Sequence, residues 1–309
     1  MLAYTLGVHK NPEQVHRLLH SIYSPDDLYY INIFGVDSLA KRSLWEDRLA
    51  TFKESNVFLA FKDSNAWGTI DQVNATLDSM KYFSGLEYSH FINLSGQCYP
   101  IIPINKIKDF FSKTKSSFIA YDKMPAYSAY EKIKNLTYPP NTAYHERFAY
   151  HYYPVLSKGP MKFIKAFLRV RKDTNLFVRI PRIKKDLLRS IELFKGSNWF
   201  CLHKFHVDYI LEYIHKNPEY SRLFSTVHCS DEHFFHIILL NSPFRSEIVN
   251  DNLRYIVWDR FGAAPEILRV ENFNEIVNSG KFFARKFDIT VDSEILDLID
   301  INNKKSSPK

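Results

Sequence analysis

The sequence predicts an α/β fold with a mostly parallel central sheet flanked by helices. Short apolar runs alternate four times with segments of helical periodicity in the first 122 residues. A length of 309 residues with 45% hydrophobic and 24% charged residues suits one soluble domain with a sizeable core. We therefore expect one domain over residues 1–300, made of parts 1–122, 123–190 and 191–300, followed by a disordered tail at 301–309.

Five apolar runs rich in β-branched and aromatic residues predict buried strands. They occupy residues 3–8, 29–35, 56–61, 89–95 and 117–122. Between them, Asn11-Pro12 begins one predicted helix and a Thr69-x-x-Gln72 capping box begins another, while 38–53 and 104–113 show helical periodicity. Parallel sheets bind ligands at the carboxyl ends of their strands. The residues expected at that edge are 7–10, 35–37, 62–64 and 95–97.

The rest of the chain is less regular. Residues 123–155 show no clean period and are interpreted as a long excursion over the ligand edge. Regular structure returns with a strand-like unit after residue 194 and a second strand at 253–258. Helices are predicted over 205–216 and 231–240.

Charge is concentrated in one segment. Of the net charge of +7, residues 158–189 contribute +9 and the rest of the chain −2. Apolar residues around Phe163 recur at helical spacing opposite Lys162, Lys165 and Arg169, which suits a helix lying on an anionic membrane surface. A solvated basic face on a packed helix is an equal alternative. A nucleic-acid-binding protein is another, although no RRM, OB or zinc-finger pattern occurs.

Cysteine usage and the absence of targeting signals indicate the compartment. Cys98, Cys201 and Cys229 cannot all pair and show no metal-type spacing, so a reducing compartment is expected. We find neither a signal peptide nor an apolar stretch of about 18 residues. The predicted location is cytoplasmic, with peripheral attachment to the inner face of the membrane as a hypothesis.

Common nucleotide-loop and hydrolase motifs are absent, and three other segments carry the functional signal. They are LAYTLGVHKNPEQVHRLLHSIYSPDD, FINLSGQCYPI and a C-terminal set of GSNWFCL, SDEHFFHIIL, LRYIVW and KFFARKFD. Together they resemble the core-2/I-branching glycosyltransferases (glycosyltransferase family 14), which also include peptide xylosyltransferases. Their order and spacing agree over residues 2–111 and 194–300.

The resemblance implies a GT-A-like nucleotide-sugar-binding fold. It also implies an inverting glycosyltransferase that needs no divalent metal. The favoured donor is UDP-GlcNAc, with UDP-xylose second, and the acceptor is a hydroxyl of a glycan or lipid-linked glycan in bacterial surface polysaccharide synthesis. Residues 1–122 would bind the donor and 191–300 would hold the catalytic and acceptor groups. Such chemistry needs a carboxylate base for the hydroxyl and positive charge for the leaving diphosphate.

Glu232 stands where the family motif carries its base, although the proline usual between Ser230 and Asp231 is missing. Asp231 is assigned to the acceptor site. Without the neighbouring matches, both carboxylates would be interpreted as charges favoured in the first turn of a helix. The cluster from His228 to His236 also suggests a zinc site, but its spacing fits no tetrahedral pattern.

Other residues are assigned to substrates by the same resemblance. Lys286 matches a family lysine that binds the diphosphate, with Arg285 or Arg260 assisting, and surface cations are the alternative interpretation. Asp37 has no second carboxylate nearby, so an Asp-x-Asp metal motif is absent. The remaining assignments are Val8, His9 and Asp37 for the nucleoside, Trp67 for the border of the donor pocket, and Trp258 and Arg147 for the acceptor.

Overall fold

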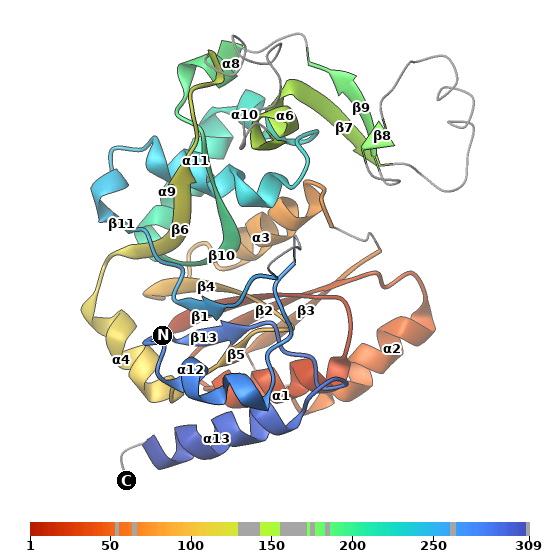
Figure 1. The fold of residues 1–309 in the computed structure, drawn as a ribbon, viewed down its shortest axis with the longest axis vertical. Helices are drawn as coiled ribbons and strands as arrows, with labels where there is room; N and C mark the ends of the chain where they lie inside the picture. Colours follow the sequence, from red (N-terminus) through yellow and green to blue (C-terminus); the bar gives the residue numbers. More distant parts are fainter. Residues whose placement is uncertain are drawn as a thin grey trace.

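The computed structural model describes residues 1–52, 56–63, 67–128, 143–154, 172–173, 177–182, 186–259 and 264–306. Its centre is a seven-stranded sheet in the order β11-β6-β10-β4-β1-β2-β3 (Figure 1). The strands are β1 (Leu2–Val8), β2 (Leu28–Phe34), β3 (Val57–Lys62), β4 (His90–Ser95), β6 (Ser117–Lys123), β10 (Phe194–His203) and β11 (Ile248–Val249). β1, β2, β3 and β4 run parallel, whereas β10 is antiparallel to β4 and β6. The predicted fold class is confirmed.

Helices cover both faces of this sheet (Figure 1). One face packs against α1 (Pro12–Ile22), α2 (Leu39–Arg48), α4 (Ile104–Lys113), α12 (Phe273–Val277) and α13 (Glu294–Ser306). The other packs against α3 (Asp71–Tyr82), α8 (Asp186–Ser190), α9 (Lys204–Lys216), α10 (Pro218–Phe224) and α11 (Phe234–Leu240). Successive side chains of a strand point to opposite faces, so Tyr4 and Leu6 of β1 enter the first core and Ala3 enters the second.

Two smaller sheets flank the central one. β12 (Arg254–Ile256), β13 (Phe283–Arg285) and β5 (Tyr99–Pro100) form the first, and β7 (Tyr150–Pro154), β9 (Phe177–Pro181) and β8 (Lys172–Asp173) form the second. The remaining helices are α6 (Ala143–Ala149), η1 (Ala50–Phe52), η2 (Ser230–Glu232), η3 (Arg245–Glu247) and η4 (Val270–Asn272). Regular structure therefore occurs within residues 123–155, for which no elements were predicted, because α6 and β7 lie there.

Three local predictions were wrong. The helix at 71–82 has no side-chain cap, because Thr69 Oγ1 accepts a hydrogen bond from the backbone of Asp71 at 3.2 Å and the predicted capping box does not form. The predicted helix over 231–240 begins only at Phe234. The tail is helical as far as Ser306, where Ile295, Leu296 and Ile299 bury the start of α13 against the first core. Residues 307–309 lie outside the described part.

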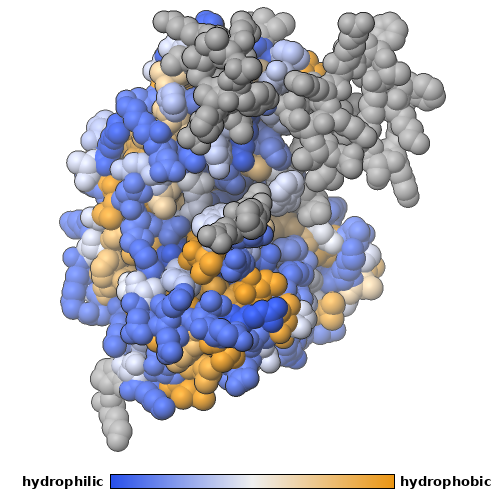
Figure 2. Space-filling model, in the orientation of Figure 1, coloured by the Kyte–Doolittle hydropathy of each residue, from blue (hydrophilic) through white to orange (hydrophobic). Residues whose placement is uncertain are grey.

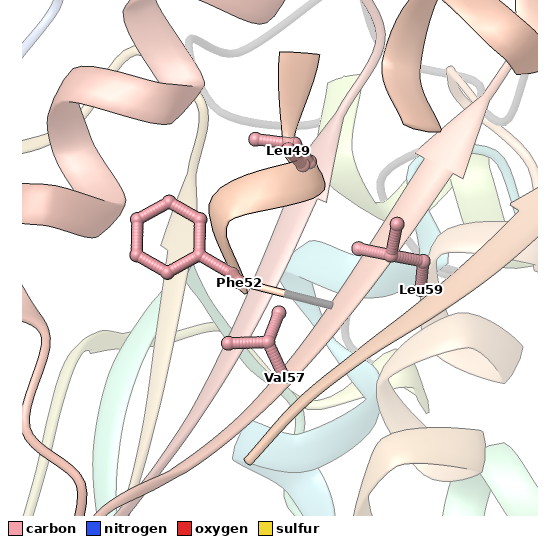
Figure 3. A pocket seen from close by; sticks show the side chains of 4 residues that line it. All are labelled: Leu49, Phe52, Val57 and Leu59. Carbon is pink, nitrogen blue, oxygen red and sulfur yellow. The ribbon is translucent and has the colours of Figure 1, made fainter. Parts of the chain in front are cut away.

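The surface carries both polar and apolar side chains (Figure 2). Hydrophilic and hydrophobic residues are interspersed on the face in Figure 2, and the hydrophobic ones gather mainly in its lower half. A small hollow between η1 and β3 is lined by the apolar side chains of Leu49, Phe52, Val57 and Leu59 (Figure 3). These side chains supply no acid, base or charge. No helix in the described ranges is both long enough and apolar enough to span a bilayer.

Candidate active site

The motif carrying Glu232 lies on a short 3-10 turn, η2, rather than in the first turn of an α-helix. The turn follows Cys229, whose backbone is left-handed with φ 50°. Cys229 N donates to Gly68 O at 3.1 Å and Ser230 Oγ donates to Thr69 O at 3.5 Å. The loop after β3 thus holds the motif in place. The side chain of Glu232 remains 35% exposed and can meet a ligand.

Arg147, on α6, reaches Glu232 across 85 positions of sequence. Its Nη1 donates to Glu232 Oε2 at 2.5 Å and to His233 Nε2 at 3.3 Å. The guanidinium lies 4.6 Å from the centre of the Tyr144 ring, and Lys195 Nζ of β10 lies 4.1 Å from the same ring. Cations over an aromatic face are attracted to it. The structure therefore brings two predicted residues together as an ion pair, within a wider basic and aromatic set.

Asp231 and His233 flank Glu232 and are both buried. Burial, followed by the negative charge of Glu232, raises the pKa of Asp231 to about 7. Burial and the charge of Arg147 hold the pKa of His233 well below its usual value. The neutral form of His233 is therefore favoured, and Asp231 holds its proton to a higher pH than an exposed aspartate does.

Aromatic side chains lie beside the loop that carries the motif. Trp67 is 58% exposed and meets the ring of His228 edge-on at 5.7 Å between centroids. His228 in turn stacks on Tyr152 of β7 at 5.3 Å. The structure thus places Trp67 beside the loop that carries Glu232.

A second group of predicted residues forms a basic corner near the carboxyl end of β1. Desolvation and the charges of Lys10 and Lys286 lower the pKa of His9, and desolvation with Lys10 and Arg285 lowers the pKa of Lys286. Lys10 pairs with Asp288 at 2.7 Å. Hydrogen bonds from Lys10 and then Thr290 lower the pKa of Asp288 to about 2. Lys286 has no carboxylate within ion-pair distance among the described residues.

The backbone beside Lys286 is fixed by two buried glutamines. Phe287 N donates to Gln97 O at 3.0 Å, and Phe287 O accepts hydrogen bonds from Gln97 at 3.2 Å and Gln14 at 3.1 Å. Gln14 also donates to Gly96 O at 2.8 Å. A Cβ on Gly96 would lie 3.0 Å from a methyl group of Val15, so a larger residue there would push Val15 aside. Lys286 is thereby held next to the carboxyl end of β4.

Arg285 adds buried positive charge to this corner. Its guanidinium lies 3.4 Å from the centre of the Trp199 ring, and burial together with Arg254 lowers its pKa to about 10. Its Nε and Nη1 are buried without a hydrogen-bond partner in the part of the chain that the structure describes. Arg254 is also buried, and it donates to the carbonyls of Asn93 at 2.9 Å and Phe200 at 3.3 Å. Burying charge is costly unless it is paired.

β10 connects the two corners. Lys195 lies near Arg147, whereas Trp199, four positions along the same strand, lies against Arg285. Four residues span at most about 14 Å. The backbone positions of Lys195 and Trp199 are therefore at most about 14 Å apart, and β10 contributes one side chain to each corner.

Several predicted residues are placed differently. Val8 is buried in the core, with only 1% of the residue exposed. Asp37 is exposed and pairs with Lys41 at 2.9 Å, which lowers its pKa. Trp258 is 53% exposed and its backbone bridges to Pro265, but no contact joins it to Glu232. Arg260 lies outside the described residues, as does most of 158–189.

The zinc alternative finds no support. His228 and His233 make hydrogen bonds to the carbonyls of Gly68 and Phe194, and His236 packs against Gly196. Within the described ranges, no group of three or more His, Cys, Asp or Glu side chains is arranged to hold a metal ion.

Sequence reasoning missed four residues of these corners: Lys10, Asp288, Lys195 and His233. Lys10 and Asp288 stand inside quoted segments, GVHK and KFD, and their opposite charges were the available signal. His233 was weighed only as a metal ligand. No pattern in the sequence indicates a role for Lys195, because its contact with Tyr144 links segments more than fifty residues apart.

A family model described as Core-2/I-Branching enzyme matches residues 2–277. Xylosyltransferase 2 of Rattus norvegicus is 24% identical over 330 residues, covering 99% of this chain and 34% of that protein. Xylosyltransferase 1 of Homo sapiens is 22% identical over 336 residues, covering 97% and 30%. The chain thus spans about a third of the length of these curated relatives.

Solved structures of glycosyltransferases are among those similar to the chain. The apo structure of WbbM bifunctional glycosyltransferase gives a TM-score of 0.39 at 11% identity, covering 99% of this chain and 51% of that one. Apo mouse xyloside xylosyltransferase 1 gives 0.31 at 10% identity, covering 78% and 82%.

Proposed function

The chain belongs to the Core-2/I-branching enzyme family of glycosyltransferases, and from this premise we propose that it transfers a sugar from a UDP-sugar to a glycan hydroxyl with inversion. Glu232 takes the hydroxyl proton while the acceptor oxygen bonds to the anomeric carbon. The bond from that carbon to the diphosphate breaks on the opposite side, and UDP leaves. Lys286 and Arg285 stabilise the charge that develops on the diphosphate.

One observation carries this proposal. The basic corner holds more positive charge than its carboxylates balance, because Arg285 and Lys286 form no ion pair in the described part of the chain. A diphosphate would supply the missing negative charge. Charge-assisted hydrogen bonds contribute roughly 1.5–3 kcal/mol each, so a few of them support transfer without a divalent metal.

The remaining assignments form part of the same proposal. Val8, His9, Asp37 and Trp67 are assigned to the donor, with Arg260 as a further candidate, and Arg147, Asp231 and Trp258 are assigned to the acceptor. UDP-GlcNAc is the donor favoured by the sequence, whereas the names of the mammalian relatives favour UDP-xylose as a second candidate. A lipid-linked glycan at the inner face of the membrane, met through residues 158–189, is the proposed acceptor setting.

The test is to incubate the purified protein with UDP-GlcNAc, UDP-xylose and other UDP-sugars in EDTA, with and without glycan acceptors. We expect UDP release from one donor, and NMR of the product should show an inverted anomeric configuration. Retained configuration would rule out a single base acting on the acceptor. If no UDP-sugar is turned over or bound, while DNA and RNA bind with steep salt dependence, the nucleic-acid alternative replaces the proposal.

A further inference from the structure

A continuous chain of hydrogen bonds runs from the backbone of β10 to the carboxylate of Glu232. His233 Nδ1 lies 2.9 Å from Phe194 O, His233 Nε2 lies 3.3 Å from Arg147 Nη1, and the same Nη1 lies 2.5 Å from Glu232 Oε2. We propose that His233 is a positioning residue, which fixes Arg147 against Glu232 and thereby orients the base. This inference rests on the proposed role of Glu232.

The hydrogen bonds define which ring nitrogen of His233 carries the proton. Phe194 O can only accept, so the proton is on Nδ1. Nε2 then presents a lone pair to Arg147, which can only donate. Only the neutral imidazole with this tautomer makes both bonds, and a protonated ring would repel the guanidinium.

The surroundings of His233 keep it in that state. Its ring is fully buried and packs edge-on against Phe148 of α6, with ring centres 4.9 Å apart. Positive groups face it from three elements: Arg147 on α6, Lys195 on β10 and, when protonated, His236 on α11. All three disfavour protonation of His233. Two carboxylates, those of Glu232 and the buried Asp231, interact with Arg147 beside the His233 ring.

Arg147 needs such an anchor because its side chain is long and has many rotamers. In the structure its guanidinium stacks on the Tyr144 ring, which also meets Lys195, while it bonds to Glu232 and His233. The bond to His233 restricts the guanidinium to the side facing Glu232 Oε2. A misplacement of about 1 Å in a reacting group can cost on the order of a hundredfold in rate.

Two substitutions at this position separate the two hydrogen bonds. His233→Asn keeps a donor near Nδ1 for Phe194 O but has no acceptor that reaches Arg147. His233→Gln places its amide oxygen near Nε2 and keeps that acceptor. We expect the Asn variant to lose about tenfold to a hundredfold in kcat for turnover of UDP-GlcNAc or UDP-xylose, with KM and the Kd for UDP unchanged. The Gln variant should recover most of kcat.

Recovery in the Gln variant is a readout that a merely structural role would not move. A role limited to packing would give equal losses in both variants, whereas the positioning role predicts a loss of kcat in the Asn variant alone. If the Asn variant does not fold, His233→Phe, which keeps the ring packing against Phe148, replaces it in the comparison. Wild-type kcat in the Asn variant, equal losses in both variants, or a loss carried by KM would overturn the inference.

Failure of this inference is distinguishable from failure of the proposed function. If Glu232→Gln transfers sugar normally, the base assignment itself is wrong. If Glu232→Gln is inactive while both His233 variants match the wild type in kcat, only the positioning role is wrong.

Discussion

The two corners of the site differ in whether their charged side chains have ion-pair partners within the protein. At the carboxylate corner, Glu232 is already paired with Arg147, and the buried neutral His233 completes the hydrogen bonds. At the basic corner, Lys10 has a partner in Asp288, whereas Lys286 and Arg285 have none in the described part of the chain. The first corner pairs its charges within the protein, whereas the second keeps two cations without ion-pair partners among the described residues.

This difference assigns separate tasks to the two corners. A base must be oriented before the acceptor arrives, since orientation determines the rate of proton transfer. A binding site for a diphosphate gains affinity when its positive charge is not cancelled from within the protein. Changes at the first corner should therefore alter kcat, and changes at the second should alter donor affinity.

The largest effect is expected for Glu232→Gln, which keeps the shape of the side chain but removes the base. We expect kcat to fall about a thousandfold, within the range known for general bases, while the Kd for UDP changes less than twofold. Steady-state kinetic assays measure kcat, and calorimetry measures the Kd for UDP. Glu212→Gln, on the surface of α9, is the matched control and should match the wild type. Weakened UDP binding in Glu232→Gln would show that the corners do not divide their tasks.

Lys286→Ala should show the reverse pattern. Loss of one charge-assisted bond of roughly 1.5–3 kcal/mol weakens UDP binding about tenfold to a hundredfold. Calorimetry over a series of salt concentrations should also show a smaller salt dependence than in the wild type. Lys281→Ala removes a nearby lysine that pairs with Asp251 at 2.7 Å and should leave UDP binding unchanged. Equal losses in both variants would mean that only the overall charge matters.

Arg285→Met separates an effect on the stability of the protein from an effect on UDP binding. In the described part of the chain, Nε and Nη1 of this buried guanidinium have no hydrogen-bond partner. Its removal should maintain or raise Tm, because relief of the desolvation cost offsets the lost contact with Trp199. The same change should weaken UDP binding by about tenfold, or 1.4 kcal/mol. Thermal unfolding and calorimetry on the same preparation check both. A large fall in Tm would show that Arg285 serves the fold rather than the donor.

The smallest effect on either corner is expected at His90, which lies at the other end of β4. Burial, and then His203 and His206, lowers its pKa from 6.5 to about 4. A lowered histidine pKa contributes stability that is complete above about pH 6.5 and is lost as the pH falls from 6.5 to 4, by roughly 3 kcal/mol at most. Denaturant unfolding across this range should follow that loss.

His90→Gln keeps a donor for Ser116 O without a titrating ring. Its stability should decline less between pH 6.5 and 4 than that of the wild type, and its activity at pH 7.5 should not change. If acid unfolding is identical in both proteins, His90 does not control it.

The parallel half of the sheet could be predicted because its signals are local. Each of the first four strands is a short apolar run, and Pro12 marks the start of the helix that follows β1. The place of β10 could not be predicted in this way. Its pairing with β4 and β6 depends on contacts between residues such as Cys201, Ile92 and Phe118, which no period along the chain records. The capping box was predicted at Thr69, but the helix begins one residue later, after Ile70, which makes no side-chain cap.

The residues of the candidate site show the same difference: some have local signals in the sequence, and others depend on long-range contacts. Glu232 and Lys286 could be assigned from short motifs, since their neighbours in the sequence carry the resemblance. The bond between Arg147 and Glu232 joins residues 85 positions apart, and α6 lies in a stretch without periodicity. The proton position on His233 depends on Phe194 O, a backbone atom that has no signature in the sequence. Substrate roles for Trp258, Asp37 and Arg260 remain predictions.

The central claim is that the basic corner binds a nucleoside diphosphate without a metal. Calorimetry of UDP with the purified protein, first in EDTA and then in Mg²⁺ or Mn²⁺, tests it most directly. The account predicts the same Kd under all three conditions and a loss of binding in Lys286→Ala. Binding that appears only with a divalent metal, or no binding of UDP at all, would contradict it.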